Sequence, residues 1–283
     1  MADLWIVSLI ILLNTFLYMF SFYLIIKNKH IQTISMRSPN LLLLNNLGGF
    51  LMSTTYIFYE LLKSIYPNVD VEKNEGFNIY CKILPNNYGI FHFLMILPYF
   101  LRYHRIIACC VLESDEDMLN NDFGSKRHRY MESYYLKILA ILMFIIVIIS
   151  FTLNYLVNNY YITPFYFDSC FLFKNKTFDN NTSKYISYFW LITNFIEQIT
   201  LATYLYFVFM NGKVNENIKI EFIIFISIWF IFPNVLRIFD IFTLKISDFT
   251  ICIICLFFLY GCLFVNGYLP IMYTLFPASL NYK

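Results

Sequence analysis

Seven long apolar stretches constrain the fold of this chain more than any other feature of its sequence. They are residues 4–26, 41–62, 83–112, 134–157, 186–210, 218–239 and 249–276. A helix needs about 20 residues to cross the roughly 30 Å hydrocarbon layer of a bilayer, and each stretch is long enough. The period-2 alternation typical of a membrane β-barrel is absent from the sequence. We therefore predict an all-α membrane protein, a single seven-transmembrane helix bundle that occupies residues 1–283.

The charge content supports a membrane protein. Only 13% of the residues are charged, whereas a soluble domain carries about 25%. Hydrophobic residues make up 59% of the chain, so we expect the lipid bilayer to cover much of its surface. The net charge of +2 gives no reason to expect a nucleic-acid partner. The first stretch follows no basic segment and no small-residue cleavage site follows it, so we expect a retained helix rather than a signal peptide.

The sequence offers no catalytic or cofactor motif. No H-E-x-x-H, G-x-S-x-G or P-loop pattern occurs, and residues 249–276 contain no lysine that could carry retinal. The four histidines fall in separate segments, which argues against a metal centre: His30, His92, His104 and His128. We therefore expect neither an enzyme nor a bound cofactor.

Two patterns favour an outside N-terminus and a cytoplasmic C-terminus. With that orientation, the cytoplasmic loops and their flanks hold 12 of the 20 basic residues, as the positive-inside rule requires. The three N-x-Ser/Thr sequons of the chain, at Asn175, Asn180 and Asn181, all fall in one loop that this orientation places outside. We predict glycosylation there and a multi-pass protein of the plasma membrane. An asparagine-rich chain also produces sequons by chance.

Two of the seven cysteines lie in or beside loops that this topology places outside. Cys81 comes just before the third stretch, and Cys170 lies midway along the loop before the fifth. Extracellular thiols are usually paired, so we expect a Cys81–Cys170 disulfide.

Charged residues within the apolar stretches are candidate ligand contacts. Glu197 lies about midway along the fifth stretch, where ionisation costs at least ~2.5 kcal/mol, so it should face the bundle and pair or protonate. It would either recognise a ligand or proton, or bond to a neighbouring helix. Arg237 and Asp240 share a helical face near the outer end of the sixth stretch, where they would contact a ligand or form a local ion pair.

This architecture resembles that of G-protein-coupled receptors: seven helices, an outside N-terminus and a disulfide from the third helix to the second outer loop. Arg105 follows Cys81 by 24 residues, close to the spacing of the signature arginine in rhodopsin-like receptors. The rhodopsin-like class itself does not fit. His104 replaces the acidic residue before that arginine, and the seventh stretch has Asn-Gly-Tyr-Leu-Pro at 266–270 in place of Asn-Pro-x-x-Tyr.

The run Met-Arg-Ser-Pro at 36–39, followed by four leucines, two asparagines and two glycines, looks more like divergent receptors of amoebae and early fungi. Some of those receptors carry a C-terminal regulator-of-G-protein-signalling domain, whereas this sequence ends seven residues after Phe276. The resemblance implies an unknown extracellular ligand and a heterotrimeric G-protein partner. It also places Asn86 and Asn87, just below Cys81, at the depth of a receptor's ligand pocket.

The resemblance further suggests a latch at the cytoplasmic end. Arg105 and, one turn earlier, Arg102 lie near the inner end of the third stretch, and Glu221 lies near the inner end of the sixth. An ion pair between these helices would hold a receptor at rest. The alternatives are that Arg105 binds anionic lipid, Glu132 or Glu113, and that Glu221 reaches headgroup water.

A transporter or channel subunit is the alternative function. It would need polar residues along a path through the membrane, and six residues could supply one: Asn14, Asn45, Asn46, His92, Glu197 and Asn266.

Overall fold

The computed structural model describes residues 4–35, 37–65, 75–112, 131–160, 181–210, 214, 216–241 and 248–275. Within these ranges every predicted stretch is helical. The long helices are α1 (Leu4–Asn28), α3 (Pro39–Ile65), α4 (Glu75–Leu112), α6 (Glu132–Tyr160), α7 (Asn181–Met210), α8 (Glu216–Ile241) and α9 (Asp248–Leu263), the last continuing through η2 (Phe264–Tyr268) into α10 (Leu269–Leu275). A short helix, α2 (Gln32–Ser35), lies between α1 and α3 and was not predicted.

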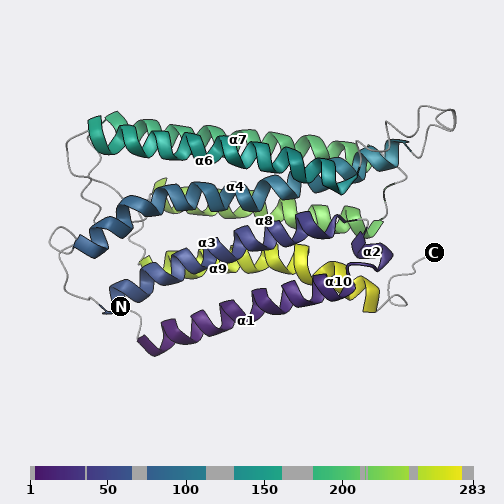
Figure 1. Cartoon of the computed structure of the whole chain (residues 1–283), viewed down its shortest axis with the longest axis horizontal. Helices are drawn as coiled ribbons and strands as arrows, with labels where there is room; N and C mark the ends of the chain where they lie inside the picture. Colours follow the sequence, from purple (N-terminus) through teal and green to yellow (C-terminus); the bar gives the residue numbers. More distant parts are fainter. Residues whose placement is uncertain are drawn as a thin grey trace.

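The long helices run side by side and alternate in direction along the chain (Figure 1). α1 starts at the left end of Figure 1, and α10 ends at the right end. α3 packs most extensively against α4, α1 and α9, so it lies at the centre of the bundle. The short helix α2 lies at the right end and contacts α10. Two ends of the bundle can therefore be distinguished, and we refer to the right one as the α2 end.

α1 shows how the bundle divides its surface between protein and lipid. Large apolar side chains at Trp5, Leu9, Leu12 and Phe16 are exposed, and their spacing of three or four residues places them on one face. A face of this kind is incompatible with water, but lipid chains cover it at no cost. The opposite face of α1 is buried at Val7, Asn14, Tyr18, Ser21 and Ile25.

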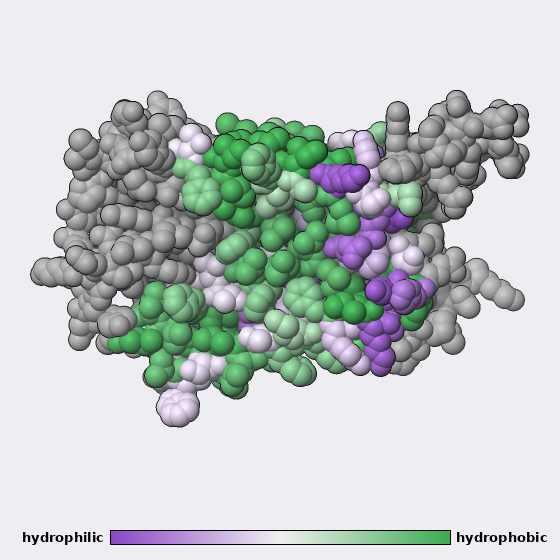
Figure 2. Space-filling view, in the orientation of Figure 1, coloured by the Kyte–Doolittle hydropathy of each residue, from purple (hydrophilic) through white to green (hydrophobic). Residues whose placement is uncertain are grey.

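Four helical segments of the described chain are long and apolar enough to span a bilayer. They are Leu4–Asn28, Pro39–Leu62, Glu132–Thr152 and Cys252–Tyr273. Only 11% of the most apolar window of Glu132–Thr152 is buried within the protein, compared with 56% in Pro39–Leu62 and Cys252–Tyr273, so α6 is peripheral and α3 and α9 are central. Figure 2 shows the hydrophobic residues as a broad band across the middle of the visible face, with hydrophilic residues gathered toward the α2 end.

Close backbone contact and a side-chain cap position α3. A Cβ atom added to Gly48 would lie 2.5 Å from the backbone nitrogen of Met95 on α4, so only glycine allows the two helices to approach this closely. At the start of α3, the Glu132 carboxylate on α6 accepts hydrogen bonds from the backbone N–H groups of Asn40 and Leu41 at 2.7 and 3.3 Å. A carboxylate there satisfies free donors of the first turn and complements the helix dipole.

Candidate functional site at the α2 end

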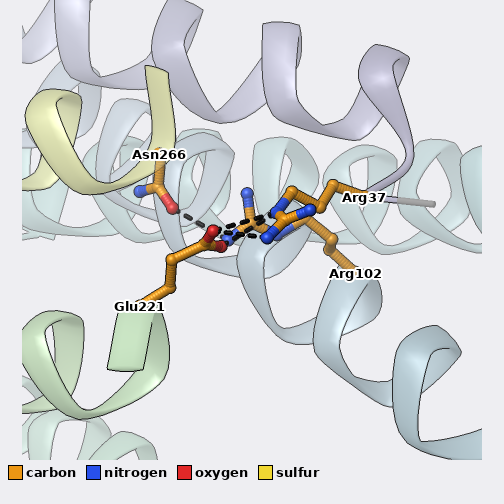
Figure 3. Close-up of polar contacts among 4 residues, drawn as sticks. All are labelled: Arg37, Arg102, Glu221 and Asn266. Carbon is orange, nitrogen blue, oxygen red and sulfur yellow. Dashed lines mark hydrogen bonds and ion pairs between the residues drawn. The ribbon is translucent and has the colours of Figure 1, made fainter. Parts of the chain in front are cut away.

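A buried ion pair joins the connector between α1 and α3 to α8 (Figure 3). Arg37 donates from Nε to both carboxylate oxygens of Glu221 at 3.0 Å, and from Nη2 to Oε1 at 2.6 Å. Arg37 is 3% exposed and Glu221 is 1% exposed. Hydrogen bonds between charged groups are stronger than those between neutral ones, and burial removes competing water. The contact ties together two segments 184 positions apart in the sequence.

Arg102 of α4 lies beside this pair and is also buried. Its Nη2 donates to the amide oxygen of Asn266 in η2 at 3.0 Å. The guanidinium also lies 5.1 and 4.9 Å from the ring centroids of Tyr99 and Tyr103, within the range of cation–π attraction. Arg102 therefore fixes α4 against the seventh helix through neutral partners. We call Arg37, Arg102, Glu221 and Asn266 the arginine–glutamate cluster.

The cluster contains two guanidinium groups and one carboxylate. Figure 3 shows Arg37 and Arg102 converging on Glu221 from different segments. Nε of Arg102 has no hydrogen-bond partner among the described residues. A buried charge without an opposite charge is costly, so Arg102 depends on the Asn266 amide and two tyrosine rings. The cluster therefore holds one more guanidinium than carboxylate, and the carboxylate is paired with Arg37.

A tight turn aims Arg37 into the bundle. The backbone N–H of Arg37 donates to the carbonyl of Ile34 at 3.0 Å, and Ser38 then adopts a φ of 55°. Positive φ costs a non-glycine residue about 1–3 kcal/mol and persists where surrounding contacts enforce it. The carbonyl of Ser38 accepts the first hydrogen bond of α3, from Leu42 at 3.0 Å, so the turn leads directly into the helix. Strain next to the buried Arg37 marks this connector as a candidate functional segment.

A π-helical turn positions Asn266. In η2 the backbone N–H of Leu269 donates to the carbonyl of Phe264, which widens the helix by one residue. Gly267 lies against α1, where an added Cβ would lie 2.2 Å from Oγ of Ser21. The glycine lets the widened turn pack against α1, which leaves Asn266 buried toward Arg102.

The latch predicted between the third and sixth stretches has a different partner in the structure. Glu221 is buried and pairs with Arg37, whereas Arg105 donates from Nη1 to Oγ of Ser38. Arg102 lies in the same cluster but donates to Asn266. The physical reason is that the connector folds inward over the α2 end.

A second buried pair lies deeper in the bundle. Nε2 of His92 on α4 lies 2.8 Å from Oε1 of Glu197 on α7, and both residues are buried. Glu197 therefore faces the bundle and contacts a neighbouring helix, which was one of the two predicted roles, and its role in ligand recognition stays a prediction. Ten residues of helix separate His92 from Arg102, which places the two polar sites about 15 Å apart along α4.

A chain of aromatic contacts connects the two sites. The rings of His92 and Trp229 lie 5.6 Å apart, Trp229 stacks on Phe225 at 5.5 Å, and Phe225 stacks on Tyr99 at 3.5 Å. Tyr99 in turn faces the guanidinium of Arg102. His92 and Tyr99 lie on α4, and Trp229 and Phe225 lie on α8, so the interface between these helices links the two polar sites through packed rings.

The buried asparagines contribute separate contacts between helices. Amide Nδ2 atoms donate across helix interfaces in three pairs: Asn14 to Thr54 at 3.4 Å, Asn46 to Ser21 at 3.0 Å, and Asn45 to the carbonyl of Met95. Asn266 belongs to the arginine–glutamate cluster instead. The single polar path considered for a transporter is therefore divided among distinct contacts in the described part of the bundle.

Several predicted residues lie outside the described part of the structure. Asn86 and Asn87 fall within α4, and Arg237 and Asp240 within α8, but their side chains are outside the description. The same holds for the side chains of Cys81 in α4 and Asn181 in α7, and for the whole of residues 170, 175 and 180. The ligand contacts, disulfide and glycosylation assigned to these residues remain predictions. Among the described residues, no group of three or more His, Cys, Asp or Glu could hold a metal ion.

No family model matches the chain, and no curated protein matches it significantly.

Proposed function

We propose that this chain is a G-protein-coupled-receptor-like membrane protein that senses an extracellular ligand and signals to a heterotrimeric G protein. Seven long helices of alternating direction, with apolar outer faces, support this proposal. In the proposed topology the N-terminus is outside, all seven helices cross the plasma membrane, and the α2 end faces the cytoplasm.

The observation that carries the proposal is the arginine–glutamate cluster. It joins the first connector, α4, α8 and η2 at one end of the bundle. In a receptor, the third and sixth helices must separate at the cytoplasmic end to admit a helix of Gα. Glu221 holds α8 in the closed arrangement through Arg37, and Arg102 offers it a second pairing. Such a two-state contact is what a ligand-driven population shift requires.

The basic residues at the α2 end support its assignment as cytoplasmic. Lys27 lies in the last turn of α1, Lys137 in the second turn of α6, and Lys219 in the first turn of α8. Arg37 and Arg105 also belong to this end. A concentration of basic residues beside the membrane is typical of the cytoplasmic face.

Copurification tests the proposal. The tagged chain would be solubilised with candidate Gα subunits, without nucleotide and with a non-hydrolysable GTP analogue. We expect one Gα class to be retained without nucleotide and released by the analogue. Glu221→Gln should increase retention, because it removes the charge that holds α8 closed. Glu216→Gln is the matched control, since Glu216 is an exposed carboxylate on the same helix. Failure of every Gα class to be retained would reject coupling.

A transporter is the second candidate, and the His92–Glu197 pair favours it. Ionisable residues buried within a membrane bundle often carry protons or substrates. Reconstitution into liposomes with an internal pH-sensitive dye distinguishes the two functions. A transporter should dissipate an imposed pH gradient or accumulate substrate, and Glu197→Gln should abolish that activity. A receptor should leave the gradient unchanged.

A further inference from the structure

One oxygen of the Glu197 carboxylate has a hydrogen-bond partner, and the other has none among the described residues. Oε1 contacts His92, whereas Oε2 has no hydrogen-bond partner in the part of the chain that the structure describes. Glu197 is only 4% exposed, so bulk water does not satisfy that oxygen. An unsatisfied buried acceptor destabilises the folded protein, and more so when it is charged. Oε2 of Glu197 therefore needs a hydrogen-bond donor that the described residues do not supply.

The charge of the site narrows the class of that donor. A carboxylate forms stronger hydrogen bonds with cationic donors than with neutral ones, and His92 contacts only Oε1 of Glu197. The guanidinium of Arg102 lies about 15 Å farther along α4 and contacts Asn266 and two tyrosine rings, and the guanidinium of Arg37 is paired with Glu221. A donor that also carries positive charge would satisfy Oε2 and compensate Glu197 together.

Aromatic rings form the surroundings of this carboxylate. Trp229 and Phe93 each lie 5.6 Å from the His92 ring, and Phe258 lies 5.2 Å from Trp229. The indole Nε1 of Trp229 is also without a hydrogen-bond partner among the described residues. Aromatic faces attract organic cations and pack against their apolar substituents. A metal ion would find few ligands here, since imidazole and one carboxylate are the only such groups in the described surroundings.

We propose that Glu197, His92 and Trp229 form the binding site for an organic ammonium ligand. The ammonium N–H donates to Oε2 of Glu197, and its apolar substituents pack against the Trp229 ring. The inference deepens the proposed function by naming the class of ligand that the receptor senses. Binding itself does not require G-protein coupling, so it is measured on the purified chain alone.

The test uses 2-phenylethylammonium as the probe and 2-phenylethanol as its neutral counterpart. The full chain in detergent is heated with increasing concentrations of each compound. We expect the ammonium to raise the unfolding midpoint by several degrees and the alcohol to leave it unchanged. Glu197→Gln should weaken the apparent affinity at least about tenfold, because the charge that selects the ammonium is lost. Glu216→Gln, the exposed carboxylate control, should retain the full shift.

A second measurement covers the case in which Glu197→Gln does not fold. The chain has three tryptophans. The ammonium should change the tryptophan fluorescence that comes from Trp229, which is the part of the signal that the Trp229→Phe variant lacks. The proposal is overturned if the probe shifts neither readout, if the alcohol acts equally, or if Glu197→Gln keeps wild-type affinity. Binding without Gα retention would reject the proposed function and keep this site. Gα retention without ammonium binding would reject this site and keep the proposed function.

Discussion

Tyr99 of α4 and Phe225 of α8 stack with their ring centroids 3.5 Å apart. This contact lies between the His92–Glu197 pair and the arginine–glutamate cluster, because Phe225 also stacks on Trp229 and Tyr99 faces Arg102. A tilt of α8 that moved Glu221 away from Arg37 would also move Phe225 relative to Tyr99, because Phe225 lies one turn after Glu221 on α8. Close-packed rings tolerate two discrete arrangements better than a continuous range, so the stack suits a switch between two states.

The first prediction concerns the energy of this stack. Phe225→Ala should reduce stability by about 3–5 kcal/mol, because it leaves a cavity among rings that the bundle cannot fill by collapse. Tyr99→Phe should change stability by less than about 1 kcal/mol, since its hydroxyl has no hydrogen-bond partner among the described residues and the ring is retained. Thermal unfolding of the two purified variants in one detergent provides the measurement. A larger loss for Tyr99→Phe would show that its hydroxyl has a structural role.

The second prediction concerns glycine at the α3–α4 contact. Gly48→Ala should destabilise the bundle by about 1–3 kcal/mol, because the added Cβ would meet the backbone of Met95, which cannot rotate away. Gly261→Ala is the matched control within α9. Its Cβ would meet Cδ1 of Ile228 at 3.1 Å, the movable end of a side chain. We expect the control to unfold within a few degrees of wild type, and equal losses in both variants would contradict the close-contact argument.

The positions of the helices could be predicted from the sequence, because a helix that spans a bilayer must have a certain length and an apolar composition. Each apolar stretch of the sequence shows both properties. The predicted ends of the helices were less accurate. α4 begins at Glu75, eight residues before the apolar stretch at 83, since backbone hydrogen bonds extend a helix into polar sequence as well. α2 was missed because four residues between two long helices carry no periodic signal.

The partners within the site were harder to predict than its members. The cost of a buried carboxylate predicts that Glu197 turns inward, but His92 becomes its partner only through the rotation of α4 against α7, which packing decides. Arg37 lies between two apolar stretches of the sequence, so hydropathy gave no sign that its side chain would be buried. The Met-Arg-Ser-Pro run at 36–39 was the available signal, because a proline that starts α3 fixes the turn before it.

The third prediction tests topology. Endoglycosidase treatment of the protein from a eukaryotic host should increase its mobility on a gel, and replacing Asn175, Asn180 and Asn181 with Gln should remove that difference. A C-terminal tag should resist protease added to intact cells and become sensitive after permeabilisation. Digestion of the tag on intact cells would show that the orientation is the opposite one, with the arginine–glutamate cluster outside.

The last prediction separates the two partners available to Glu221. Removing one member of a buried ion pair typically costs about 3–5 kcal/mol, because the other charge is left without compensation. Arg37→Gln should cost less than this, since Arg102 lies in the same cluster and can take up the carboxylate. Glu221→Gln should cost the full amount, because the cluster would then hold two buried guanidinium groups and no carboxylate. In thermal unfolding, the midpoint of Glu221→Gln should therefore fall below that of Arg37→Gln, and adding Arg102→Gln to Arg37→Gln should remove the difference. An Arg37→Gln variant as unstable as Glu221→Gln would mean that Arg102 cannot replace Arg37, and the two-pairing switch would be excluded.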